Sequence, residues 1–287
     1  MPKIAYVNGR YVRQADGAVH IEDRGFQFGD GVYEVWALAD GKLTDPAGHF
    51  RRLKRSLAEL RIAAPMDEPA LKIVLREVVR RNRVCDGLLY LQVTRGAAPR
   101  DHVFPDPNTA PTLVITAKTT DHAASEARAE AGVAVISLPE NRWGRCDIKT
   151  VNLLPNVLAK QAAKEGGAAE AWFVDDLGLV TEGASSNAWI VDATGVLRTR
   201  SLQSNILRGV TRDTLIAVAG VAGLTLDERP FTISEALAAR EAFITGAGTL
   251  VMPVVMLNGA QLGNGRPGPV AKRLRALYIQ EARRAAL

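Results

Sequence analysis

Residues 145–152 read RCDIKTVN, and they join the two halves of the chain whose patterns decide the fold. They follow a predicted strand at 132–137 and precede a predicted short helix at 157–164. Lys149 has apolar neighbours here, so its side chain is a candidate for partial burial. Burial lowers the pKa of a lysine and makes its neutral amine available as a nucleophile. An ordinary exposed lysine fits the same pattern. The pattern alone therefore does not distinguish a buried, nucleophilic lysine from an exposed one.

The first half of the chain predicts strands and two helices. Asn8-Gly9 is a favoured hairpin-turn pair inside a predicted hairpin at 4–12. Asp45-Pro46 supplies the N-cap and the first residue of a helix, and apolar residues follow at helical spacing. The other predicted elements are strands at 31–38, 42–43, 88–94 and 113–116 and a helix at 69–81.

The second half mixes strands and helices without strict alternation, which favours an α+β fold over a doubly wound sheet. Residues 119–131 are polar, alanine-rich and weakly patterned, so we place a domain boundary near residue 122. We expect an N-terminal α+β domain over 1–122 and a C-terminal domain over 123–287. The predicted elements of the second half are strands at 132–137, 171–174, 188–191, 242–245 and 251–257 and helices at 157–164, 210–221 and 270–284.

The composition is that of a globular chain with a mild positive charge. Of 287 residues, 47% are hydrophobic and 23% charged, and the excess of 36 Lys and Arg over 31 Asp and Glu gives a net charge of +5. Aromatic residues are 6%, whereas a nucleic-acid binder usually shows a denser basic stripe interleaved with aromatics. We therefore expect no nucleic-acid partner, and a basic-surface binding module stays open as the non-enzymatic alternative.

Cysteine and histidine usage favours a cytoplasmic protein without a metal. Cys85 and Cys146 are too few for a disulfide framework and fit a reducing compartment. The N-terminus carries no signal-peptide apolar core, and uncharged stretches such as 215–226 are too short to span a bilayer. The four histidines are scattered without ligand spacing, so no metal and no membrane contact are expected.

A run of small residues surrounds one carboxylate at 180–187, VTEGASSN. Small side chains permit close backbone approach to a ligand, and Glu182 could hold a charged pyridinium nitrogen. A surface turn that contains a glutamate is the alternative interpretation.

Three further stretches are candidates for binding an anion. Gly209 leads into a predicted helix whose first N–H groups could bind a phosphate, together with the hydroxyl of Thr211. The glycine-rich turn at 246–249 follows a strand and is weaker evidence. Arg100 and His102 share a loop, and arginine binds carboxylates through a bidentate fork. A capped helix, a tight turn and a solvated loop explain the same three stretches without a ligand.

Taken together, these stretches resemble class IV (fold type IV) pyridoxal 5′-phosphate (PLP) aminotransferases, and within them the D-amino-acid group. The resemblance covers nearly the whole chain in the same order. It implies a two-domain α+β fold, with a small N-terminal α/β domain and a larger C-terminal PLP-binding domain of mixed β structure. The matching stretches are DRGFQFGDGVYEV at 23–35, CDIK at 146–149, TEG at 181–183, SSN at 185–187 and GVTRD at 209–213.

The resemblance implies a role for each matching position. Lys149 would form the Schiff base with PLP and then move the proton of the substrate Cα. Glu182 would pair with the pyridine nitrogen and keep the ring an electron sink. The other implied cofactor contacts are Arg52, Val210, Thr211 and Ala247 at the phosphate, Leu207 on the ring face and Ser186 near the cofactor.

Tyr33, Arg100 and His102 match the family's trap for the substrate carboxylate. In the family two of these come from the neighbouring subunit, so a homodimer with shared active sites is implied. Two departures stand out. The turn at 246–249, GAGT, replaces a stretch richer in serine and threonine, so phosphate-binding hydroxyls are reduced. Asp101 stands where a small residue is usual, and its charge could pair with Arg100.

The resemblance predicts transfer of an amino group between a D-amino acid, such as D-alanine or D-glutamate, and a 2-oxo acid, by alternation with pyridoxamine phosphate. Alternatives with the same fold are a branched-chain L-amino-acid transaminase, an (R)-amine transaminase and an aminodeoxychorismate lyase. Arg100 and His102 within PRDHVFP favour the D-amino-acid prediction. Tyr33-Glu34-Val35 points away from the branched-chain group.

Overall fold

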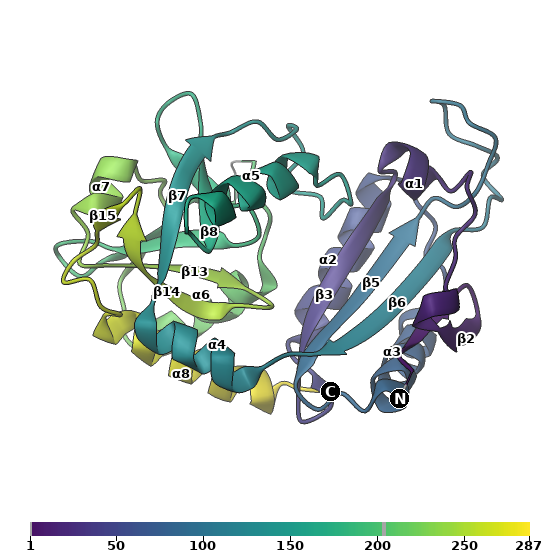
Figure 1. The fold of residues 1–287 in the computed structure, drawn as a ribbon, viewed down its shortest axis with the longest axis horizontal. Helices are drawn as coiled ribbons and strands as arrows, with labels where there is room; N and C mark the ends of the chain where they lie inside the picture. Colours follow the sequence, from purple (N-terminus) through teal and green to yellow (C-terminus); the bar gives the residue numbers. More distant parts are fainter. Residues whose placement is uncertain (1, 203–204) are drawn as a thin grey trace. The chain divides into compact units, whose positions relative to one another are not determined.

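The computed structural model describes residues 2–202 and 205–287, and the chain divides into two compact units (Figure 1). Unit 1 comprises Met1–Asp121, Ile148–Asn152 and Ala285–Leu287. Unit 2 comprises His122–Asp147 and Leu153–Arg284. Unit 1 is therefore discontinuous in the sequence, because it includes the short segment that carries Lys149.

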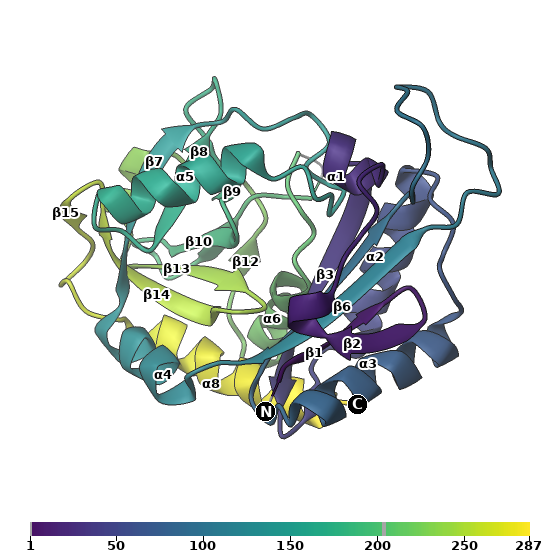
Figure 2. The same cartoon turned by 45° about the vertical axis from the view of Figure 1, so that its right-hand side comes forward.

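Unit 1 is built on a six-stranded antiparallel sheet with the strand order β2-β1-β6-β5-β3-β4. Its first two strands form the predicted hairpin, which Figure 2 shows beside β6. Asn8 and Gly9 both have positive φ, as a two-residue hairpin turn of this kind requires. The strands are β1 (Ile4–Val7), β2 (Arg10–Arg13), β3 (Gly31–Ala39), β4 (Lys42–Leu43), β5 (Gly87–Thr94) and β6 (Thr112–Thr119).

Two helices, α2 (Pro46–Glu59) and α3 (Glu68–Asn82), pack on one face of this sheet. The side chain of Asp67 accepts a hydrogen bond from the N–H of Ala70 and caps α3. Successive residues of a strand point to opposite faces, so Trp36 is buried under the helices while Tyr33 is only partly buried on the other face.

The short helix α1 (Arg24–Phe28) is fixed by residues of the stretch at 23–35, which matched the family in the sequence analysis. The side chain of Asp23 accepts from the N–H of Gly25 and from the hydroxyl of Thr94, each at 2.9 Å. Asp30 forms a bidentate pair with Arg95 at 2.7 and 2.9 Å. A Cβ on Gly25 would overlap the side chain of Thr94, which explains the glycine. These residues of the stretch 23–35 hold the start of β3 in place.

The segment 148–152 attaches to the first half of β3. The N–H of Tyr33 donates to the carbonyl of Lys149 at 2.9 Å, and the N–H of Val151 donates to the carbonyl of Gly31 at 3.0 Å. This edge of β3 is available because β4 pairs only with Leu38 and Ala39 at its far end. The backbone of Lys149 is thereby held as firmly as a strand residue.

Unit 2 contains a nine-stranded mixed sheet with the order β12-β11-β10-β13-β14-β7-β8-β9, and β15 pairs with β14. The strands are β7 (Val133–Pro139), β8 (Glu170–Val174), β9 (Val180–Gly183), β10 (Asn187–Val191), β11 (Leu197–Thr199), β12 (Leu226–Asp227), β13 (Glu241–Gly246), β14 (Leu250–Leu257) and β15 (Ala260–Gln261). The helices are α4 (His122–Ala131), α5 (Leu154–Glu165), α6 (Val210–Val221), α7 (Ile233–Leu237) and α8 (Pro269–Arg284).

Both faces of the sheet in unit 2 are buried. On β10, Trp189 joins the core formed with α6 and α8, whereas Ala188 and Ile190 join the core on the opposite face. Helix α5 covers β7 and β8 with Ala159 and Ala163 (Figure 1). Strands that are covered on both faces read as continuous apolar runs, which is how the sequence predicted them.

The predicted α+β organisation is confirmed, and the differences lie in short strands and in short or weakly apolar helices. The sequence analysis missed the helices α1, α4 and α7 and the strands β9, β11, β12 and β15. Helix α4 lies in the weakly patterned stretch where the sequence analysis placed the domain boundary. It was missed because Ala129 is its one buried residue, so no apolar spacing marks the helix. Within the described ranges, no helix is long and apolar enough to cross a membrane, and no group of three or more His, Cys, Asp and Glu residues could hold a metal ion.

Replacing Leu89 by alanine should lower the free energy of unfolding of unit 1 by about 2–5 kcal/mol. Leu89 is fully buried on the central strand β5, so truncation leaves a cavity under α2 and α3. Urea unfolding followed by tryptophan fluorescence measures the loss. Leu88→Ala, on the partly exposed face of the same strand, is the matched control and should cost clearly less.

Candidate active site

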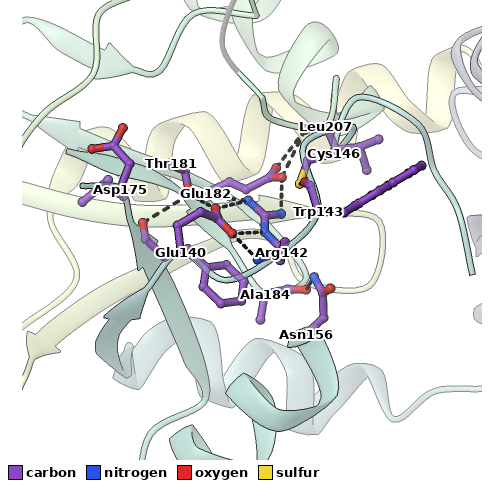
Figure 3. Close-up of polar contacts among 12 residues, drawn as sticks. Glu140, Arg142, Trp143, Cys146, Asn156, Asp175, Thr181, Glu182, Ala184 and Leu207 are labelled. Atoms are coloured by element: carbon purple, nitrogen blue, oxygen red, sulfur yellow. Dashed lines mark hydrogen bonds and ion pairs between the residues drawn. The ribbon is translucent and has the colours of Figure 1, made fainter. Parts of the chain in front are cut away.

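The carboxylate of Glu182 is buried on β9 and fixed by three partners, of which Figure 3 shows Arg142 and Leu207. Arg142 Nη1 donates to Oε1 at 2.6 Å, and Asn187 Nδ2 donates to Oε2 at 3.0 Å. The N–H of Leu207 donates to both oxygens, at 3.1 and 3.2 Å. Burial raises the pKa of Glu182, and the bonds from Arg142 and Leu207 act in the opposite direction. The carboxylate is thus held in position by donors from three segments of the chain.

Arg142 joins Glu182 to a second carboxylate, that of Glu140. Its Nη2 and Nε donate to Glu140 at 2.6 and 2.9 Å, and its guanidinium lies 4.6 Å from the ring centroid of Phe173. The hydroxyl of Thr181 also donates to Glu140, at 2.8 Å. Burial opposes ionisation, but the bonds from Arg142 leave the pKa of Glu140 below its ordinary value. The sequence analysis missed Arg142, because an arginine in a polar loop reads as exposed.

The small residues near Glu182 leave room for polar side chains that pass close to the backbone. The hydroxyl of Ser186 donates to the buried carboxylate of Glu170 at 3.0 Å, and a Cβ on Gly183 would overlap that hydroxyl. A Cβ on Gly209 would overlap the side-chain oxygen of Asn187, and the side-chain nitrogen of the same residue donates to Glu182. The backbone of Ser186 therefore lies next to the Glu182 site, while its hydroxyl is hydrogen-bonded to Glu170.

The start of α6 presents backbone N–H groups. Val210 and Thr211 are buried in its first turn, directly after Gly209, and no side chain of the described residues caps the helix. Unpaired N–H groups and the helix dipole favour an anion at this position. Ala247 lies in the turn between β13 and β14, at the end of β13 that pairs with the start of β10.

In unit 1, Lys149 lies beside Tyr33. The lysine Nζ is 4.1 Å from the centroid of the tyrosine ring, and that ring stacks on Tyr90 at 5.7 Å. Lys149 is half-buried, as the sequence analysis considered. Burial raises the pKa of Tyr90 to about 12, so its phenol stays neutral. Tyr33, predicted to bind the substrate carboxylate, is thereby in contact with the predicted catalytic lysine.

Arg52 is held by a carboxylate on the opposite face of β3. Its Nε and Nη2 donate to the two oxygens of Glu34 at 2.7 and 2.8 Å, and His49 Nδ1 lies 2.7 Å from the same carboxylate. Burial alone would raise the pKa of Glu34, but Arg52 and His49 lower it to about 2. Burial lowers the pKa of His49. The predicted phosphate ligand thus has an oriented guanidinium, and the sequence analysis did not identify Glu34 as its partner.

Arg100 and His102 lie together on the ring of Phe28. The Arg100 guanidinium is 5.0 Å and the His102 ring 5.5 Å from its centroid. The Asp101 carbonyl accepts from buried Arg24 at 2.6 Å, which anchors the loop. The Asp101 carboxylate accepts from the N–H of Val103 at 3.4 Å. The structure therefore groups Arg100 with His102, and groups Tyr33 separately with Lys149.

The family follows from a match over most of the chain. Residues 31–257 match the model of the class IV amino-transferases. The chain belongs to the class IV aminotransferases. This aminotransferase is 42% identical to a D-alanine aminotransferase of Bacillus licheniformis, over 93% of each chain. It is 39% identical to a D-alanine aminotransferase of Listeria monocytogenes serotype 4b, over 96% of this chain and 94% of that one.

Solved structures confirm the fold of this class IV aminotransferase. A T.th. branched-chain amino acid aminotransferase with pyridoxamine 5′-phosphate matches with a TM-score of 0.90 and 26% identity, covering 100% of this chain and 98% of that one. A branched-chain amino acid aminotransferase from Escherichia coli matches with a TM-score of 0.88 and 25% identity, covering 98% and 95%. The predicted recognition of the family from its motifs is confirmed.

Acid should destabilise unit 1 through Glu34. A carboxyl whose folded pKa lies below its unfolded value stabilises the fold above the unfolded pKa and loses that contribution as the pH falls toward the folded pKa. The shift from 4.5 to about 2 corresponds to about 3 kcal/mol, lost between about pH 4.5 and pH 2. Glu34→Gln should be less stable at pH 7 but lose less stability over this interval, as measured by urea unfolding at several pH values.

Glu77→Gln is the control for this acid response. Glu77 also binds two arginines, but solvent screens its interactions on the surface of α3. Its replacement should leave the steep loss below pH 4.5 in place. An acid profile of Glu34→Gln that parallels wild type would refute the account.

Replacing Arg142 by methionine should destabilise unit 2 by about 3–5 kcal/mol, since the buried carboxylate of Glu182 and the partly buried one of Glu140 would lose their shared cation. Adding Glu140→Gln to this variant should restore part of the loss. Chemical unfolding at pH 7 measures both. Arg145→Met is the matched control: Arg145 pairs with Asp147 at the surface, so the change should stay below about 1 kcal/mol. Equal losses in the two arginine variants would contradict the assignment.

Proposed function

We propose that this class IV aminotransferase uses PLP to transfer an amino group between a D-amino acid, such as D-alanine or D-glutamate, and a 2-oxo acid. The observation that carries the proposal is the buried, fixed carboxylate of Glu182 in a chain 42% identical to a D-alanine aminotransferase. Two relatives of this name, from different genera, support the same substrate class.

The described residues suit the three groups of PLP that a protein has to bind: the pyridine nitrogen, the phosphate and the aldehyde. Glu182 offers a fixed carboxylate to the pyridine nitrogen. The first turn of α6, with Thr211, offers N–H groups to the phosphate. Lys149 offers an amine to the aldehyde. PLP, when bound, supplies a ring that takes up the electrons released at the substrate Cα.

The residues of this chain then have distinct tasks. With PLP bound, Lys149 would hold it covalently and would afterwards carry the proton of the substrate Cα, since a free amine held at that carbon is a suitable base. Glu182 would hold a proton on the ring nitrogen. Glu34 orients Arg52, so that the guanidinium can add positive charge at the phosphate. The remaining proposed cofactor contacts are Ser186, Leu207, Val210 and Ala247.

The residues proposed to bind the substrate carboxylate, Tyr33, Arg100 and His102, lie in two separate groups in unit 1. Arg100 and His102 lie on Phe28, whereas Tyr33 lies on Lys149. We propose that the trap is completed in a homodimer, with residues from two subunits at each active site. Two thiols without a disulfide, Cys85 and Cys146, fit the proposed cytoplasmic location.

A branched-chain L-amino-acid transaminase is the second candidate. The T.th. and Escherichia coli branched-chain enzymes match the fold with TM-scores of 0.90 and 0.88, but with 26% and 25% identity. Because the D-alanine aminotransferases share 42% and 39%, the D-amino-acid assignment has the stronger support. An (R)-amine transaminase and an aminodeoxychorismate lyase are further alternatives with this fold.

Purified enzyme with PLP and 2-oxoglutarate should convert D-alanine to pyruvate, and L-alanine, L-valine and L-leucine should react at least about a hundredfold more slowly. Coupled assay of pyruvate and chromatography of the glutamate product measure the turnover. Lys149→Ala should lose at least about a thousandfold in rate, because the base is removed. Lys54→Ala, at an exposed position of α2, is the control. Preferred turnover of L-valine, or a near-normal rate in Lys149→Ala, would refute the proposal.

A further inference from the structure

The loop that joins β5 to β6, residues 95–111, carries Arg100 and His102. Its two ends lie close together, since a Cβ on Gly96 would overlap the carbonyl oxygen of Ala110. Gly96 also has a positive φ of 99°, a conformation that favours glycine. A loop this long is usually mobile unless other parts of the protein bind it. The contacts that bind this loop therefore decide where its side chains lie.

Arg24 of α1 provides the first attachment of the loop. Its Nη1 donates to the carbonyl of Asp101 at 2.6 Å, and its guanidinium lies 4.7 Å from the ring centroid of Phe28. The same ring carries the Arg100 guanidinium at 5.0 Å and the His102 ring at 5.5 Å. Arg24 is buried. The carbonyl that it holds thus lies between the two residues predicted to bind the substrate carboxylate.

Arg95 provides the second attachment, at Phe104. Its guanidinium lies 3.7 Å from the ring centroid of Phe104. Its Nη1 and Nη2 donate to the carbonyls of Arg61 and Leu60, directly after α2, at 2.9 and 2.7 Å. A guanidinium that stacks on an aromatic ring can still donate from the edge of its own plane. Arg95 therefore ties the loop to α2, the helix that carries Arg52.

One carboxylate, that of Asp30, holds both of these arginines. Its Oδ2 accepts from Nε of Arg24 at 2.9 Å and from Nε of Arg95 at 2.7 Å, and its Oδ1 accepts from Nη2 of Arg95 at 2.9 Å. Burial would raise the pKa of Asp30, but the bonds from Arg95 and Arg24 leave it below its ordinary value. The two attachments of the loop therefore share one ionised anchor, directly before β3.

From these contacts we infer that Arg24, held by Asp30, is a positioning residue of the proposed carboxylate trap. Arg24 fixes the carbonyl of Asp101, and this bond places the side chains on either side of it, those of Arg100 and His102. A guanidinium binds a carboxylate through two parallel hydrogen bonds only in the right plane, and a misplacement of about 1 Å can cost about a hundredfold. The inference deepens the proposed function and rests on it, since it names the residues that set the affinity for the substrate carboxylate.

Arg24→Met tests the assignment through the kinetics with D-alanine at saturating 2-oxoglutarate. Asp30 keeps Arg95 in this variant, so no buried carboxylate loses its only cation. The KM for D-alanine should rise about ten- to a hundredfold, with kcat within about threefold of wild type. In an Arg100→Ala background the same change should add less than about threefold, because both changes act through one group. Additive increases in KM would overturn the inference.

Two further variants separate positioning from charge and from a general structural role. Arg24→Lys keeps the positive charge but loses the planar fork, so its KM should still rise at least about fivefold. Arg275→Met is the matched control, since Arg275 is likewise buried, pairs with Glu126 and donates to two backbone carbonyls. It should lower the melting temperature but leave KM within about threefold. A wild-type KM in Arg24→Lys, or an equal rise in Arg275→Met, would overturn the inference.

Hydrogen–deuterium exchange of the apoenzyme tests the anchor without cofactor or turnover. In Arg24→Met the amides of residues 97–105 should exchange at least about tenfold faster than in wild type, whereas β3 and β5 should keep their rates. Unchanged exchange in the loop would overturn the inference alone. A wild-type enzyme that does not transfer the amino group of D-alanine would overturn the proposed function and the trap with it, even where the exchange rates confirm the anchor.

Discussion

A buried carboxylate is the constraint around which unit 2 is organised. Glu182 is 4% exposed, so its charge must be matched by donors of the protein. Arg142, Asn187 and the N–H of Leu207 supply them, and each comes from a different segment. The glycine at 209 is required because Asn187 passes directly in front of it. The position of α6 is thereby tied to the carboxylate, and so is the helix end that is proposed to bind a phosphate.

Unit 1 uses a second buried carboxylate in a comparable way. Glu34 is fully buried on β3 and orients Arg52, while Tyr33, its neighbour on the strand, points to the other face and meets Lys149. Because the backbone of Lys149 pairs with β3, the lysine is placed by sheet hydrogen bonds. A single strand thus positions a proposed phosphate ligand on one face and the proposed base on the other.

The sequence predicted what local patterns record. Apolar runs located most of the buried strands but not β9 or β11. Helical spacing located α2, α3 and α8, and a glycine before an apolar helix marked the start of α6. Buried partners were not predicted, since Arg142, Glu140 and Glu34 are polar residues whose burial depends on contacts distant in the sequence. The attachment of residues 148–152 to β3 has the same origin. The family could nevertheless be identified from the sequence, because the matching stretches occur in the same order along the chain.

The central claim is that Glu182 maintains a protonated ring nitrogen on the bound cofactor. The most direct measurement is ¹⁵N NMR of the enzyme loaded with PLP labelled at the pyridine nitrogen. We predict the chemical shift of a protonated nitrogen in wild type and that of an unprotonated nitrogen in Glu182→Gln. An unprotonated nitrogen in wild type, or the same protonated signal in both proteins, would contradict the account.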